Sequence, residues 1–140
     1  MVTPEQVRLI RESFTGISEL SGPIATLFYG RLFELAPEVR PLFRQDIAVQ
    51  GKKLMDTLAA LVASLDQFET LKPTLKAMGQ RHAGYGVQSG HYATVGAALL
   101  WALGTALQTD FSPERKAAWR ALIEGVSAVM MDGADELSHG

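Results

Sequence analysis

Cysteine is missing from the 140-residue chain. Its absence excludes disulfides, thiolate metal clusters, thiol catalysis and cofactors attached covalently through thioethers, and it suits a reducing compartment. Residues 1–12 start with polar side chains and contain no apolar segment followed by a small-residue cleavage site, so they do not match a secretory signal peptide. We therefore expect a cytoplasmic location.

A strong charge of one sign is also missing, because the formal net charge is −2 and basic and acidic residues are interleaved. The chain has neither the basic stripe of a nucleic-acid-binding protein nor a polybasic membrane anchor. One uncharged stretch, 88–109, could form a membrane span of about 20 residues. Polar side chains and three glycines interrupt it, which favours a helix buried in a protein core. We expect no nucleic-acid partner and no membrane partner.

Alternation of apolar and polar residues at period two is absent over any useful length, so no strand is predicted. Apolar residues instead recur every three or four positions, and 47% of all residues are hydrophobic. This pattern predicts one all-α domain over residues 1–140, with about seven helical segments and a frayed tail from about residue 132. The predicted segments are approximately 4–17, 22–35, 37–43, 47–65, 73–84, 89–107 and 113–131.

One histidine lies on an apolar helical face. His82 follows Met78 by four residues, and Met78 follows Leu75 by three, so a helix places them on one side. A neutral imidazole is the commonest metal-ligand side chain, and iron held by one protein nitrogen in apolar surroundings is typical of haem. A buried histidine bonded to the backbone would explain the same pattern, so both interpretations stay open. We expect His91 and His139 to be ordinary residues of the surface or the tail.

Two further polar side chains, Tyr29 and Gln50, lie on helical faces that are otherwise apolar. A buried amide has to be hydrogen-bonded or has to point into a cavity. Tyr29 could simply satisfy its hydroxyl inside the core, and Gln50 could turn out to solvent. Together with His82, these side chains predict a polar site inside an apolar core.

Five motifs accompany these polar residues in the sequence: LFYGRLFELAPEVRPLF (27–43), QGKKLMDTL (50–58), MGQRH (78–82), YGV (85–87) and RKAAW (115–119). With these motifs the sequence resembles the globin family over essentially its whole length, and Pro37, Phe43 and His82 together make the resemblance specific. It is most similar to single-domain bacterial globins akin to neuroglobin and to the Hell's Gate globin type, which shares the tyrosine and glutamine pair. The resemblance implies a globin fold packed around a haem pocket.

The resemblance also implies roles for individual residues. His82 would be the proximal ligand of haem b iron, with its other ring nitrogen donating to the Met78 carbonyl, and Phe43 would pack on the haem. Tyr29 and Gln50 would donate hydrogen bonds to bound oxygen on the distal side. Gln50 stands where most globins place a histidine, and an amide is a far poorer iron ligand. The remaining implied pocket residues are Lys53, which reaches a haem propionate or is simply solvated, Leu54, Val87, Tyr92, Val95 and Ile123.

These implied roles indicate a haem protein that binds oxygen and other diatomic ligands reversibly, for transport, storage, scavenging or sensing, as a monomer or weak homodimer. The alternative is an enzyme, a nitric oxide dioxygenase that oxidises nitric oxide to nitrate. Because the sequence carries no flavin or nicotinamide domain, that reaction would need a separate reductase. Peroxidase-like chemistry is a weaker third interpretation, since no distal acid–base histidine is apparent.

Overall fold

The computed structural model describes residues 2–43 and 46–139, and the side chains of residues 2–43 and 46–136. Every regular element within these residues is a helix, which confirms the all-α prediction. The α-helices are α1 Pro4–Glu19, α2 Ser21–Leu35, α3 Ile47–Ala63, α4 Phe68–Gly84, α5 Ser89–Leu107 and α6 Pro113–His139. The short 3₁₀-helices are η1 Pro37–Leu42, η2 Leu65–Gln67 and η3 Gln108–Asp110.

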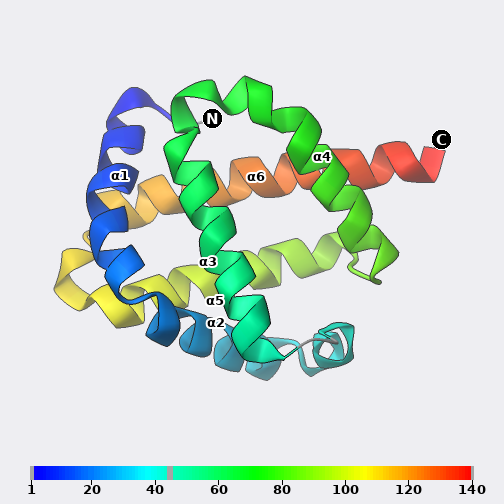
Figure 1. The fold of residues 1–140 in the computed structure, drawn as a ribbon, viewed down its shortest axis with the longest axis horizontal. Helices are drawn as coiled ribbons and strands as arrows, with labels where there is room; N and C mark the ends of the chain where they lie inside the picture. Colours follow the sequence, from blue (N-terminus) through cyan, green and yellow to red (C-terminus); the bar gives the residue numbers. More distant parts are fainter. Residues whose placement is uncertain (1, 44–45, 140) are drawn as a thin grey trace.

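The helices cross one another in two layers. Helix α3 crosses in front of α5 and α6 in Figure 1, and α4 meets the C-terminal half of α6. Helix α2 packs along α5, and α1 packs against the first half of α6. The largest side chains that are fully buried come from four of these helices: Ile10, Ile17, Ile24, Leu32, Leu103, Trp119 and Leu122.

Two helix starts are fixed by local side chains. The N–H of Gln6 donates to Oγ1 of Thr3 at 3.1 Å, and the N–H of Thr3 donates to Oε1 of Gln6 at 2.9 Å. Asp46 accepts from the N–H of Ala48 at 2.9 Å ahead of α3. Each contact satisfies a backbone donor that has no partner inside its helix. The first turns of α1 and α3 are therefore determined locally.

Helix α4 begins at Phe68, five residues before the predicted start at Pro73, so that boundary prediction is wrong. Proline inside the helix leaves the Glu69 carbonyl without its usual donor. Phe68 is only 8% exposed, and a Cβ atom on Gly125 of α6 would lie 4.0 Å from its Cζ atom. Burying a phenylalanine side chain contributes about 1.5 to 3 kcal/mol, which offsets the missing hydrogen bond.

Helix α6 continues to His139, so the predicted frayed tail from about residue 132 is also wrong. Gly133 is buried directly against the backbone of Lys76 in α4. Nζ of Lys76 lies 2.7 Å from Oε1 of Glu136, one turn further along α6. These contacts with α4 hold the helix in place beyond Met131. The side chain of His139 lies outside the described part of the chain.

Helix α5 confirms the prediction that the uncharged stretch is a buried helix. Its buried residues are Gly96, Ala98, Leu99, Ala102, Leu103 and Leu107. Among the described residues, no helix is both long enough and apolar enough to cross a membrane. His91 caps the start of α5, because its Nδ1 atom accepts from the N–H of Gln88 at 3.0 Å.

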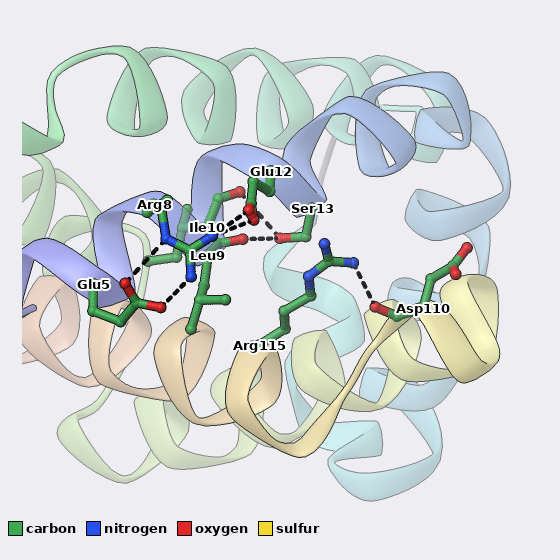
Figure 2. A network of polar contacts seen from close by, with 8 residues as sticks. All are labelled: Glu5, Arg8, Leu9, Ile10, Glu12, Ser13, Asp110 and Arg115. Carbon is green, nitrogen blue, oxygen red and sulfur yellow. Dashed lines mark hydrogen bonds and ion pairs between the residues drawn. The ribbon is translucent and has the colours of Figure 1, made fainter.

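A buried hydrogen bond joins α6 to α1. Nε1 of Trp119 donates to Oγ of Ser13 at 2.8 Å, and Ser13 in turn lies within hydrogen-bond distance of the Leu9 and Ile10 carbonyls. Figure 2 shows the contacts of this serine with the carbonyls of Leu9 and Ile10 as dashed lines. Trp119 is fully buried, so its N–H depends on the serine for a partner.

We expect Ser13→Ala to lower the free energy of unfolding by about 1 to 3 kcal/mol, because it leaves the Trp119 N–H buried without an acceptor. Urea denaturation of the parent and the variant measures this loss. Ser18→Ala is the matched control, since Ser18 is an exposed serine of the same helix. Equal effects of the two substitutions would contradict the assignment.

Candidate functional site

His82 lies in the last turn of α4 and is half-buried. Its Nδ1 atom is 2.7 Å from the carbonyl oxygen of Met78, which confirms the predicted contact. A carbonyl can only accept, so Nδ1 carries a proton, and in the neutral tautomer the lone pair lies on Nε2. Among the described residues, Nε2 has no hydrogen-bond partner. This contact therefore fixes the orientation of the ring and leaves Nε2 as the nitrogen that could meet a ligand.

The backbone after α4 turns sharply around Gly86. This residue has φ of 101°, a left-handed conformation that glycine adopts without strain. A Cβ atom here would lie 3.1 Å from Cδ2 of Leu42 in η1. The turn brings the N–H of Val87 within 3.0 Å of the His82 carbonyl. The end of the histidine helix is thus closed by Val87 and packed against η1.

Tyr29 lies in a cluster of aromatic rings on α2 and at the end of η1. Its ring centroid is 4.8 Å from that of Phe28, 6.0 Å from that of Phe33 and 5.4 Å from that of Phe43. Most of these pairs meet edge to face, the favourable arrangement for aromatic rings. The cluster holds the tyrosine ring in one position, with only 5% of the residue exposed.

The hydroxyl of Tyr29 has no hydrogen-bond partner among the described residues. Burial raises the pKa of Tyr29 to about 12. The phenol is therefore protonated throughout the neutral range and available as a donor. This arrangement differs from the alternative in which the hydroxyl is satisfied inside the core.

Gly51 lets α3 approach Tyr29 closely. A Cβ atom on Gly51 would lie 2.9 Å from the Cβ atom of Ala25 and 3.9 Å from Cε2 of Tyr29. Gln50 is the neighbour of Gly51 and is half-buried, so it does not extend fully into solvent. The backbone of α3 therefore approaches the tyrosine ring at Gly51, the residue that follows Gln50.

The other predicted pocket residues come from several elements and are mostly apolar. Phe43 follows η1, Leu54 is on α3, Tyr92 and Val95 are on α5, and Ile123 is on α6, and each is half-buried against the core. Val87 is also half-buried, whereas Lys53 is exposed on α3. A Cβ atom on Gly96 would lie 3.2 Å from Cγ2 of Ile123, so α5 and α6 meet beside Val95.

Sequence reasoning missed Phe33 as a member of the site. Its ring centroid lies 5.5 Å from that of Phe43 as well as beside Tyr29. Phe33 follows Tyr29 by four residues, so helical spacing could have placed the two rings together. No cluster of three or more histidine, aspartate or glutamate residues suited to a metal ion occurs in the described part of the chain.

Comparisons of this chain with known proteins agree on one family. The family model of the globins matches residues 26–130. Neuroglobin-1 of Oncorhynchus mykiss is 29% identical, and the alignment covers 94% of this chain and 92% of the relative. A flavohemoprotein of Rhodopirellula baltica is also 29% identical, over 81% of this chain. Flavohemoprotein B of Dictyostelium discoideum is 25% identical over 98% of this chain. The chain spans only 29% and 33% of these two flavohemoproteins.

Two solved structures share the arrangement of helices. One is an engineered carbene transferase made from a candidate nitric oxide dioxygenase of Rhodothermus marinus, with 26% identity and a TM-score of 0.89, covering 99% of this chain and 97% of that chain. The other is a bacterial globin of Campylobacter jejuni, with 23% identity and a TM-score of 0.85, covering 99% of this chain and 100% of that chain. The second comparison supports the fold alone.

The raised pKa of Tyr29 predicts a pH dependence of stability in the haem-free protein. Above pH 10 the phenol ionises in the unfolded chain but stays protonated in the folded chain until about pH 12, so stability is lost over this interval. We expect the parent to lose about 1 to 3 kcal/mol more than Tyr29→Phe between pH 10 and pH 12. Urea denaturation at each pH measures the difference, and a constant difference would contradict the prediction.

Proposed function

Since this chain belongs to the globin family, we propose that it is a haem b protein that binds oxygen reversibly through iron held by His82. The observation that carries the proposal is the 2.7 Å contact between Nδ1 of His82 and the Met78 carbonyl. This contact leaves the lone pair of Nε2 for a metal, as a proximal ligand requires. The alternative, in which His82 is only a buried histidine bonded to the backbone, gives Nε2 no role.

We propose that the half-buried apolar residues named above surround a large, flat, mainly apolar group bound at His82. Half-buried apolar side chains from several elements supply its surroundings, and the rings of Phe33 and Phe43 add aromatic faces. Lys53 is exposed on α3 and supplies a cation suited to a propionate at the pocket edge. The further contacts proposed for the haem are those of Leu54, Val87, Tyr92, Val95 and Ile123.

Tyr29 and Gln50 are proposed to hold the oxygen molecule. Haem, when bound, supplies the iron that takes up oxygen and shifts negative charge toward the outer oxygen atom. The Tyr29 hydroxyl is protonated and has no other partner within the described residues, so it can donate to this atom. The amide of Gln50, on the neighbouring helix, supplies a second donor. Each hydrogen bond in such an apolar site contributes about 1 to 2 kcal/mol.

A second candidate function is oxidation of nitric oxide to nitrate. It is favoured by the similarity to two flavohemoproteins and to a structure derived from a candidate nitric oxide dioxygenase. In this case Tyr29 and Gln50 would retain the oxygen until nitric oxide arrives. A separate reductase would return the iron to the ferrous state. The two functions are distinguished by repeated nitrate formation when nitric oxide, oxygen and a reductase are supplied together.

The protein is further proposed to act in the cytoplasm, as a monomer or weak homodimer. Oxygen and other diatomic molecules are its proposed ligands. Both proposed functions are consistent with this setting, because a reducing compartment keeps the iron in the ferrous state that binds oxygen.

His82→Ala should remove the iron ligand and most haem retention, because no other described side chain combines an oriented imidazole with apolar surroundings. Absorption spectra and haem content of the purified variant measure this loss. His91→Ala is the matched control, since His91 caps α5 and is not a proposed ligand. Full haem content with an unchanged ferrous spectrum in His82→Ala would place the ligand elsewhere.

Tyr29→Phe and Gln50→Leu should each raise the oxygen dissociation rate by about ten- to thirtyfold, which corresponds to the loss of one hydrogen bond. The double variant should be non-additive, because both donors address one acceptor atom. Stopped-flow replacement of oxygen by carbon monoxide gives the rates. Tyr85→Phe, which removes an exposed hydroxyl, is the control. Rates within about twofold of the parent for Tyr29→Phe would show that the phenol points elsewhere.

A further inference from the structure

Helix α4 contacts α6 through its backbone at Gly79. A Cβ atom on Gly79 would overlap the carbonyl oxygen of Met130, and it would lie 2.6 Å from the carbonyl carbon and 2.8 Å from the Cα atom of that residue. All three atoms belong to the backbone of α6, so no side-chain rotation could make room. Any larger residue at position 79 therefore has to separate the two helices.

A second glycine makes the reciprocal contact. A Cβ atom on Gly133 of α6 would overlap the carbonyl oxygen of Lys76 and lie 2.6 Å from its Cα atom. Lys76 precedes Gly79 by one turn, and Gly133 follows Met130 by one turn, so the two helices run antiparallel here. The ion pair between Lys76 and Glu136 extends the contact by another turn of α6. We call these five residues the α4–α6 seam.

The seam is connected to His82 by a single peptide group. The carbonyl that accepts the hydrogen bond from Nδ1 of His82 belongs to the peptide joining Met78 to Gly79. His82 itself lies three residues beyond Gly79, about 4.5 Å along the helix axis. A displacement of α4 at Gly79 therefore moves both the imidazole and the carbonyl that orients it.

We propose that Gly79 and Gly133 are positioning residues for the iron ligand, because the seam sets the height and tilt of His82 relative to the haem. This inference rests on the proposed function, in which His82 binds the iron. The distance between packed helices depends on the side chains at the contact. The Met130 carbonyl oxygen lies closer to the Cβ position than its carbonyl carbon at 2.6 Å, so restoring an ordinary contact of 3.4 Å requires α4 to move by more than about 1 Å. A shift of that size changes the strength of the iron–imidazole bond, and so the retention of oxygen.

Gly79→Ala and Gly133→Ala test the proposal from the two sides of the seam. Gly84→Ala is the control on α4, because nothing lies within 4 Å of its Cβ position, and Gly125→Ala is the control on α6, because its closest contact is 4.0 Å. The readout is the iron–histidine stretching band of the ferrous protein in resonance Raman spectra. We expect both seam variants to displace this band and both controls to leave it unchanged. The oxygen dissociation rate should change by roughly two- to thirtyfold in the seam variants.

A second experiment separates positioning of His82 from a general loss of packing. In a His82→Gly background, free imidazole supplied in solution binds the iron without a covalent link to α4. Adding Gly79→Ala or Gly133→Ala to this background should leave the iron–imidazole band where it is. A displacement that persists without the link would overturn the proposal, because the seam would then act on the pocket by another route.

The outcomes also separate this inference from the proposed function. A parent protein whose iron–histidine band is absent would contradict the role of His82 itself. A normal band in the parent that stays unchanged in every folded seam variant would overturn only the role of the seam. If either alanine variant fails to fold, Glu136→Gln replaces it, since it removes the ion pair with Lys76 at the exposed end of the seam. A smaller displacement of the band is expected there.

Discussion

The hydrogen bond between His82 and the Met78 carbonyl is the constraint on which the site depends. It fixes the proton on Nδ1, and so it decides which ring nitrogen can meet a metal. Without this contact, the imidazole of His82 could rotate, and its proton could lie on either ring nitrogen. The aromatic cluster around Tyr29 provides a comparable restraint, because ring packing holds a phenol whose hydroxyl has no partner among the described residues.

Much of the helical pattern was accessible from the sequence because it is determined locally. The capping box of Thr3 and Gln6, the cap at Asp46 and the exact bounds of α5 depend on residues within a few positions of one another. The contact between His82 and Met78 is local in the same sense, since four residues span one helical turn. The roles proposed for Tyr29 and Gln50 rest on the family resemblance, because spacing alone leaves them open.

The features that sequence analysis missed depend on distant parts of the chain. Helix α4 starts at Phe68 because the buried ring packs beside Gly125, and this outweighs the proline signal at position 73. Helix α6 continues past Met131 because Gly133 and Glu136 meet Lys76 of another helix. A glycine in a helical segment weakens the local preference for a helix, and nothing in its neighbourhood shows that a backbone will pack against it.

The packing of α4 on α6 has a consequence for how the protein is made. Synthesis proceeds from the N-terminus, so residues 68–84 leave the ribosome well before residues 130–136, against which they finally rest. The helix with His82 lacks its main support during this interval. Helices α1, α2 and α3 can already begin to pack. The packing around His82 is therefore completed only after residues 130–136 have been released.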